Sequence, residues 1–141
     1  MAEIPRQILV EKENIEEVLR NLNTVILKKE RSFIELAAIA TCLHNFYNGT
    51  ENILKQALSF ADVKVARTET WHKDLLKLSA ANNIISESLQ DDLYELLSFR
   101  HFFVHSYGFM LEKNQLETLA EKIPVVWKRF SSEILRYFQS R

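Results

Sequence analysis

Apolar residues recur every three or four positions along most of the chain, which is the spacing of one face of an α-helix. The pattern predicts helices over about residues 5–29, 32–65, 69–80 and 114–139, and another that begins near residue 88. The second segment carries two adjacent apolar stripes, so we expect it to lie at the centre of the molecule. No segment alternates as a strand does. The sequence therefore predicts an all-α fold, an up-and-down bundle of four to five helices.

Residues that end or bend helices are few, with two glycines and two prolines in 141 residues. Long helices with short connections are therefore expected. Gly49 falls inside the second helix, where it costs about 1 kcal/mol relative to alanine, and we expect it to allow another helix to approach closely. Ser88 and Asp91 have the spacing of a capping box at the start of the fourth helix. Pro124 predicts a kink or a split in the last helix.

The composition is that of an ordinary globular protein, with 47% hydrophobic and 26% charged residues. We find no linker or repeat, and expect a single domain over residues 1–141. No apolar run approaches the roughly 18 residues that span a bilayer, and the first residues lack the apolar core of a signal peptide. We therefore expect a cytoplasmic protein without a membrane segment. Cys42 is the only cysteine, which excludes an internal disulfide.

The segment "SFRHFFVHSYGF", residues 98–109, places Arg100, His101, His105 and Tyr107 among phenylalanines. A guanidinium is a permanently charged fork that suits phosphate, and an imidazole can move a proton near neutral pH. Positions 100 and 105 lie about 140° apart around a regular helix. The two groups therefore meet on one ligand only if Arg100 reaches round the helix or the helix breaks near Gly108. Together they are the minimal set for phosphodiester chemistry.

The pattern Arg100-x4-His105-x-Tyr107 resembles the signature of HEPN-domain ribonuclease toxins of the HepT type. Two further blocks, "LHNFYNGTENILKQAL" (residues 43–58) and "ETWHKDLL" (residues 69–76), resemble the same family in order and separation. The resemblance covers about two thirds of the chain. Many members of that family have Asn directly after the Arg, whereas this chain has His101.

The resemblance implies an all-α homodimer in which both copies of the motif face a cleft between the subunits. It also implies metal-independent RNA cleavage that needs no cofactor, with Arg100 holding the scissile phosphate. His105 would move the proton of the attacking 2′-hydroxyl or of the leaving group. In the HepT branch, the residue that matches Tyr107 receives AMP from a cognate minimal nucleotidyltransferase antitoxin, which blocks the cleft. We therefore expect the toxin of such a toxin–antitoxin system, an endoribonuclease with RNA, transfer RNA among the candidates, as substrate.

Other side chains are candidates for binding the substrate. His101, His72 and Lys73 could line the cleft beside the motif. Trp71 is expected in the core. Tyr107 also fits an ordinary core or interface aromatic residue.

The motif residues also have structural explanations. Arg100 could extend from its apolar helix to a surface ion pair with Asp92 or Glu95. His105 could be a hydrogen-bonded core histidine. His101 and His105 have the i, i+4 spacing that can bind zinc. No third ligand has a supporting spacing, so no metal site is expected.

The formal net charge of −1 gives no general attraction to RNA, so binding must use local patches. Two basic patches are present in the sequence: Lys64, Arg67, His72, Lys73 and Lys77, and a tail patch of Lys128, Arg129, Arg136 and Arg141. Acidic residues load the start of the motif helix: Glu87, Asp91, Asp92 and Glu95. These carboxylates disfavour tight nonspecific binding and favour a structured RNA that is selected by shape.

Two other classes of function remain open on the sequence. A non-catalytic HEPN module would be an adaptor or nucleotide-binding subunit of a nucleotidyltransferase complex and would not cleave RNA. A purely structural helical interaction protein is the third alternative. RNA cleavage that Arg100→Ala or His105→Ala abolishes would distinguish the enzyme from both.

Overall fold

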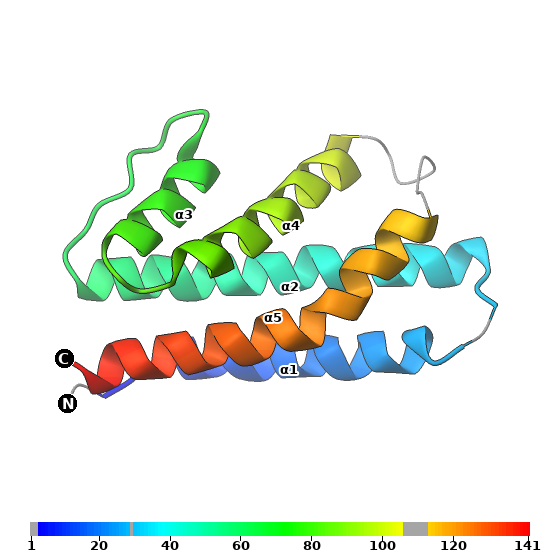
Figure 1. Ribbon diagram of the computed structural model, residues 1–141, viewed down its shortest axis with the longest axis horizontal. Coiled ribbons are helices and arrows are strands. Elements are labelled where there is room, and N and C mark those ends of the chain that lie inside the picture. Colours follow the sequence, from blue (N-terminus) through cyan, green and yellow to red (C-terminus); the bar gives the residue numbers. More distant parts are fainter. Residues whose placement is uncertain (1–2, 29, 106–112) are drawn as a thin grey trace.

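The computed structural model describes residues 3–28, 30–105 and 113–141, and the side chains of all of these except residues 102–105. The described residues contain no strand and form five helices: α1 (Arg6–Ile26), α2 (Phe33–Phe60), α3 (Trp71–Ala81), α4 (Glu87–His105) and α5 (Lys113–Gln139). This arrangement confirms the predicted all-α bundle (Figure 1). Within the described part of the chain, no helix is both long enough and apolar enough to cross a membrane.

Helix α2 is the central element, as its two apolar stripes predict. It packs against each of the other four helices. Figure 1 shows α1 and α5 along one side of α2 and the shorter α3 and α4 along the other. Leu54, Ile39 and Phe46 of α2 are fully buried. The core therefore forms around α2, and this helix can hold side chains from both layers.

The ends of α2 follow from local capping. Ser32 and Glu35 form a capping box, in which the Ser32 N–H donates to Glu35 at 2.9 Å and the Glu35 N–H donates to the Ser32 hydroxyl at 3.2 Å. The Lys28 ammonium and the Ser32 N–H hold the pKa of Glu35 at about 2. The helix ends at Phe60, five residues before the predicted end near Val65.

The chain turns after α2 and after α3 through the same backbone motif, and neither turn contains a glycine. Asp62 (φ 58°) and Asn83 (φ 59°) adopt the left-handed conformation directly after the helix ends. The Val63 N–H then donates to the Leu58 carbonyl at 2.9 Å, and the same type of contact follows Asn83. These contacts form Schellman motifs, in which glycine is usual and asparagine or aspartate is tolerated. The chain can therefore turn sharply with only two glycines.

The start of α4 differs from the predicted capping box of Ser88 and Asp91, which is wrong. The capping residue is Ser86, whose hydroxyl accepts from the Leu89 N–H at 3.2 Å. A leucine cannot complete a capping box, and Glu133 of α5 instead accepts the Ser86 N–H at 2.6 Å. The beginning of α4 is therefore fixed by a contact from a helix 47 residues away in sequence.

Two predicted irregularities have different outcomes. Helix α5 continues through Pro124, so the predicted split is wrong, whereas the bend that Figure 1 shows in α5 agrees with the predicted kink. The prediction for Gly49 is confirmed, since a Cβ atom there would lie 2.5 Å from Cγ1 of the buried Ile15 in α1. The absent side chain lets α1 and α2 approach.

Candidate functional site

Arg100 continues the buried stripe of α4. Leu93 and Leu96 lie on the same face of this helix and are buried against the core, and Arg100 takes the next position on that face and is half-buried. Its Nε donates a 2.8 Å hydrogen bond to Oδ1 of Asn48 in α2. Among the described residues, no partner bonds the two terminal nitrogens of this guanidinium. Within that part of the chain, the charged end of the fork therefore keeps hydrogen-bonding capacity that suits an anion.

Asn48 is itself held by a histidine. Because its Oδ1 accepts from Arg100, its Nδ2 donates to Nε2 of His44, at 3.0 Å. An Nε2 that accepts carries no proton. Burial and, secondly, the charge of Arg100 lower the pKa of His44, which favours this neutral form. A neutral imidazole thus orients Asn48, and Asn48 orients the guanidinium.

One turn further along α2, a buried carboxylate binds a residue of α3. Glu51 is 4% exposed, and its Oε2 lies 2.7 Å from Nδ1 of His72. Lys55 lies 3.8 Å from its other oxygen. The neighbouring Tyr47 is buried, and its hydroxyl makes no hydrogen bond within the described part of the chain. Burial and then the charge of Glu51 raise the pKa of Tyr47, while Arg100 opposes this shift.

These contacts lie along one face of α2. We call the four side chains the polar row: His44, Asn48, Glu51 and Lys55. Steps of four, three and four residues place them on a single helix face. The spacing is visible in "LHNFYNGTENILK", yet the row was not predicted from the sequence, because the apolar stripes beside it dominate the pattern. The polar row joins Arg100 of α4 to His72 of α3.

The structure places the other motif residues only in part. His101 is exposed on α4. His105 is the last residue of that helix, and its side chain is among those that the structure does not describe. The helix continues through both Arg100 and His105, so position 105 falls on the face of the exposed Ser98 and His101, about 140° from Arg100. Tyr107, and the predicted break near Gly108, lie outside the described residues. Helix geometry alone does not bring positions 100 and 105 together.

The candidate substrate-binding residues of α3 occupy different surroundings. His72 is part-buried and held by Glu51. Lys73 is exposed, with its ammonium 5.6 Å from the ring centre of Tyr94. Trp71 is only partly buried, although it was expected in the core. The imidazole of His72 therefore belongs with the polar row, whereas Lys73 contacts Tyr94 of α4.

Ion pairs with α5 occupy two of the acidic residues of α4. Asp92 pairs with Arg129 at 2.8 Å, and Glu95 pairs with Lys122 at 2.9 Å. The pairing with Glu95 raises the pKa of Lys122. The alternative in which Arg100 pairs with Asp92 or Glu95 is therefore wrong. The pairs also offset part of the negative charge on the motif helix.

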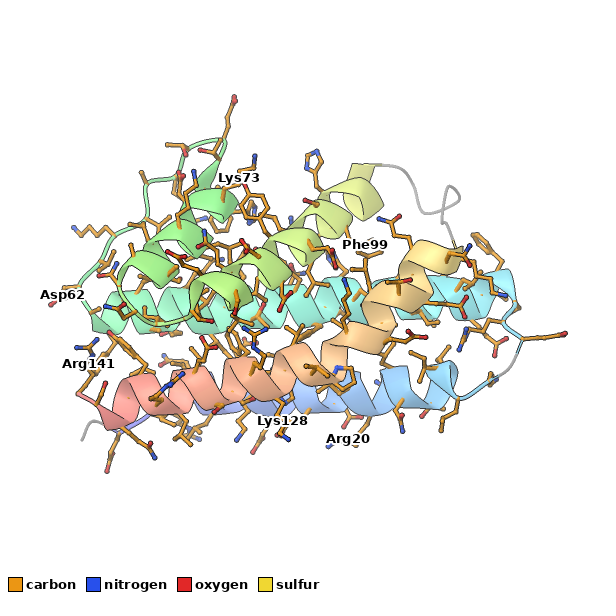
Figure 2. All side chains as sticks on the ribbon, in the orientation of Figure 1. Arg20, Asp62, Lys73, Phe99, Lys128 and Arg141 are labelled. Carbon is orange, nitrogen blue, oxygen red and sulfur yellow. The ribbon has the colours of Figure 1, made fainter. Side chains whose placement is uncertain are left out.

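The two basic patches lie apart. In Figure 2, Lys73 of the first patch and Lys128 of the tail patch point from opposite sides of the bundle. The ion pair of Arg129 further reduces the charge that the tail patch offers. The two patches therefore do not form one continuous basic surface.

Other chemistry is limited within residues 3–28, 30–105 and 113–141. These residues include no group of three or more His, Cys, Asp or Glu side chains that could hold a metal ion. The thiol of Cys42 is free and half-buried, and burial raises its pKa, so it is protonated at neutral pH.

Comparisons with known proteins agree with this fold. A family model described as HepT-like protein matches residues 38–141. The structure is similar to a chain in the crystal structure of a toxin-antitoxin with AMP-PNP, with a TM-score of 0.83 and 16% identity over 94% of this chain and 99% of that one. It is also similar to a mutant of the toxin-antitoxin MntA-HpeT (TM-score 0.71, 16% identity, 92% and 95% covered).

A further similar structure is YutE, a cytosolic protein of unknown function from Bacillus subtilis, with a TM-score of 0.69 and 14% identity over 99% of this chain and 94% of that one. No curated protein matches the sequence. At these identities the three structures share the fold with this chain.

Proposed function

Because the chain belongs to the HepT-like family, we propose that it is the toxin of a toxin–antitoxin pair and that it cleaves RNA with Arg100 and His105. The two similar structures described as toxin-antitoxin support the first part. The hydrogen bond from Arg100 to Asn48 carries the second part, because it fixes a cation at the end of α4 and leaves its terminal nitrogens for a phosphate.

Arg100 holds the scissile phosphate. Its Nε is committed to Asn48, so the two terminal nitrogens present a planar edge that matches two phosphate oxygens. As the 2′-oxygen attacks, negative charge builds on those oxygens, and a fixed guanidinium stabilises it without having to reorganise. The neutral state of His44 keeps a second positive charge away from Asn48.

His105 moves the proton. A neutral imidazole takes the proton of the 2′-hydroxyl while the 2′-oxygen forms a bond to phosphorus, and the bond from phosphorus to the 5′-oxygen breaks. A proton from an imidazolium then goes to the leaving 5′-oxygen. The products are a 2′,3′-cyclic phosphate and a 5′-hydroxyl, and neither a metal nor a cofactor takes part in the proposed steps.

Two copies of the chain complete the site. Positions 100 and 105 lie on different faces of a continuous α4, so a groove between two subunits would let Arg100 of one copy meet His105 of the other. In a symmetric dimer the same pair forms twice. This homodimer is the one that the HepT-like motif implies.

Tyr107 is the control point. A minimal nucleotidyltransferase antitoxin would transfer AMP to it: the phenolic oxygen bonds to the α-phosphorus of ATP, pyrophosphate leaves, and the phenol loses its proton. The resulting phosphodiester places negative charge two residues after His105, where it competes with RNA for Arg100. RNA and ATP both occur in the cytoplasm, which is the compartment that we propose.

The test is RNA cleavage by the purified protein in a chelator, with transfer RNA as the first substrate. Wild type should produce 2′,3′-cyclic phosphate ends, and Arg100→Ala and His105→Ala should each abolish cleavage. Lys128→Ala is the control and should cleave normally, because Lys128 lies on the opposite side of the bundle from Lys73. A wild-type protein that binds a nucleotidyltransferase but cuts no RNA would instead support the non-catalytic adaptor.

A further inference from the structure

A cavity of about 400 Å³ lies at the other end of the polar row from His44. The end of α2, the connection between α2 and α3, and the start of α3 form its walls. Its floor includes the apolar Leu58 and Leu75. We call its polar part the basic pocket, which consists of Lys55, Lys64, Arg67 and Trp71.

The basic pocket is positively charged. Three cations line the cavity, against one carboxylate, that of Asp62. Within the described residues, no carboxylate oxygen lies within 4.0 Å of the charged nitrogens of Lys64 or Arg67. Elsewhere the structure pairs such cations, as with Arg129 and Asp92. Lys55 is already paired with Glu51 at 3.8 Å, so the cations that favour an anionic ligand are the exposed Lys64 and Arg67.

Trp71 orients two of these cations. The Lys55 ammonium lies 4.5 Å from the centre of its ring, and the guanidinium carbon of Arg67 lies 5.0 Å from it. Cation–π contacts of this kind hold long side chains that would otherwise sample many rotamers. A ligand that binds ordered cations loses less conformational entropy on binding.

The basic pocket and Arg100 lie along the same face of α2. Lys55 is the last member of the polar row, seven residues after Asn48, which corresponds to about 10 Å along the helix axis. Figure 1 shows α3, whose start lines the basic pocket, and α4, which carries Arg100, on the same side of α2. A single RNA strand covers such a distance within a few nucleotides.

We propose that the basic pocket is a second phosphate-binding site, which holds a backbone phosphate of a single-stranded RNA segment whose scissile phosphate is bound by Arg100. This inference rests on the proposed function, since it concerns the same substrate. Basic side chains combined with an aromatic ring are a common arrangement in sites that bind single-stranded RNA. The pocket binds the strand at a position away from the cleaved bond. Such a local basic site is needed because the net charge of the whole chain is close to zero. A free nucleotide carries the same phosphate chemistry, so the experiment separates the two sources.

The experiment measures binding without cleavage. The full chain carries His105→Ala as the common background, and fluorescence anisotropy follows a labelled 12-nucleotide RNA at several salt concentrations. The test variant adds Lys64→Gln and Arg67→Gln, both exposed residues. The control variant adds Lys128→Gln and Arg136→Gln, which remove the same charge from the tail patch. Circular dichroism and thermal melts verify that both variants fold.

The test variant should bind the RNA about tenfold more weakly, and the slope of log affinity against log salt concentration should fall by about 0.7, the contribution of one phosphate contact on a single strand. The control variant should match the background. Unchanged RNA affinity in the test variant, or an equal loss in the control, would overturn the inference. The same assay with labelled AMP separates the two sources: loss of AMP binding with intact RNA binding would also overturn the inference and would indicate a nucleotide site.

Failure of this inference and failure of the proposed function are separable. If wild type cuts no RNA but the test variant still loses RNA affinity selectively, the basic pocket is upheld and the ribonuclease is not. If wild type cleaves RNA in an Arg100-dependent manner but the test variant binds RNA normally, the basic pocket is refuted and the ribonuclease is upheld.

Discussion

The Nε atom of Arg100 donates a 2.8 Å hydrogen bond to Oδ1 of Asn48, which ties the end of α4 to the middle of α2. Asn48 in turn donates to His44 at 3.0 Å. The contact joins two segments that are 52 residues apart in sequence. It makes the orientation of the guanidinium a property of the bundle and not of α4 alone.

Asn48 is a positioning residue in this account, and Asn48→Ala should therefore impair cleavage without removing Arg100. We expect RNA cleavage to fall about 10- to 100-fold in single-turnover assays, because the guanidinium loses its fixed direction. The free energy of unfolding should fall by about 1.5–3 kcal/mol, since a hydrogen bond to a charged group is lost. Asn45→Ala, which removes an exposed amide from the same helix, is the matched control. Full activity in Asn48→Ala would show that Asn48 does not position Arg100.

The neutral state of His44 predicts a pH dependence of stability. Burial and Arg100 lower the pKa of His44 in the folded protein, below the value of about 6.5 in the unfolded chain. The unfolded state therefore binds the proton more readily, and stability is lost as the pH falls below that value. His44→Gln keeps an acceptor for Asn48 but does not titrate. Urea unfolding at pH 7, 6 and 5 should show a steeper loss for wild type, and parallel curves would contradict the assignment.

Gly49 should resist substitution because of its contact with Ile15. A Cβ atom would lie 2.5 Å from Ile15 Cγ1, and such overpacking costs about 1–3 kcal/mol. Helix propensity returns about 1 kcal/mol, so Gly49→Ala should lose up to about 2 kcal/mol in urea unfolding. In an Ile15→Ala background the same change should be neutral or stabilising. Equal costs in both backgrounds would rule out the contact as the cause.

Tyr107→Phe should keep RNA cleavage but prevent its inhibition by AMP transfer. Phenylalanine has no oxygen to receive AMP, so coexpression with the cognate nucleotidyltransferase should add no mass to the variant, and RNA cleavage should persist. Wild type should gain AMP and lose cleavage under the same conditions. Tyr94→Phe removes a hydroxyl from α4 and should still be modified. Intact mass spectrometry reads the result, and AMP found on Tyr107→Phe would place the modification elsewhere.

The fold was predictable to the extent that it depends on local pattern. Helical periodicity identified all five helices, and the two stripes of α2 indicated its central place. The end of α2 was predicted too late because Asp62 takes the left-handed position that a glycine would have revealed. The cap of α4 was misplaced because Glu133, from a distant helix, completes it. Both errors concern helix ends, where a single side chain determines the residue at which the helix begins or ends.

The candidate site was only half predictable. Arg100 was identified from its spacing to His105 and Tyr107, since motif spacing is a local property. Its partner Asn48 was not, because only tertiary packing brings α2 and α4 together. The buried Glu51 was also missed, although its place in a polar row of 4-3-4 spacing was a usable signal.

The central claim is that Arg100 and His105 act on one phosphodiester across two subunits. Arg100→Ala and His105→Ala, each inactive alone, should recover about one quarter of wild-type RNA cleavage when coexpressed in equal amounts, because half of the dimers are mixed and each mixed dimer holds one intact site. Activity of either variant alone at the wild-type level, or a coexpressed mixture that stays inactive, would contradict the account.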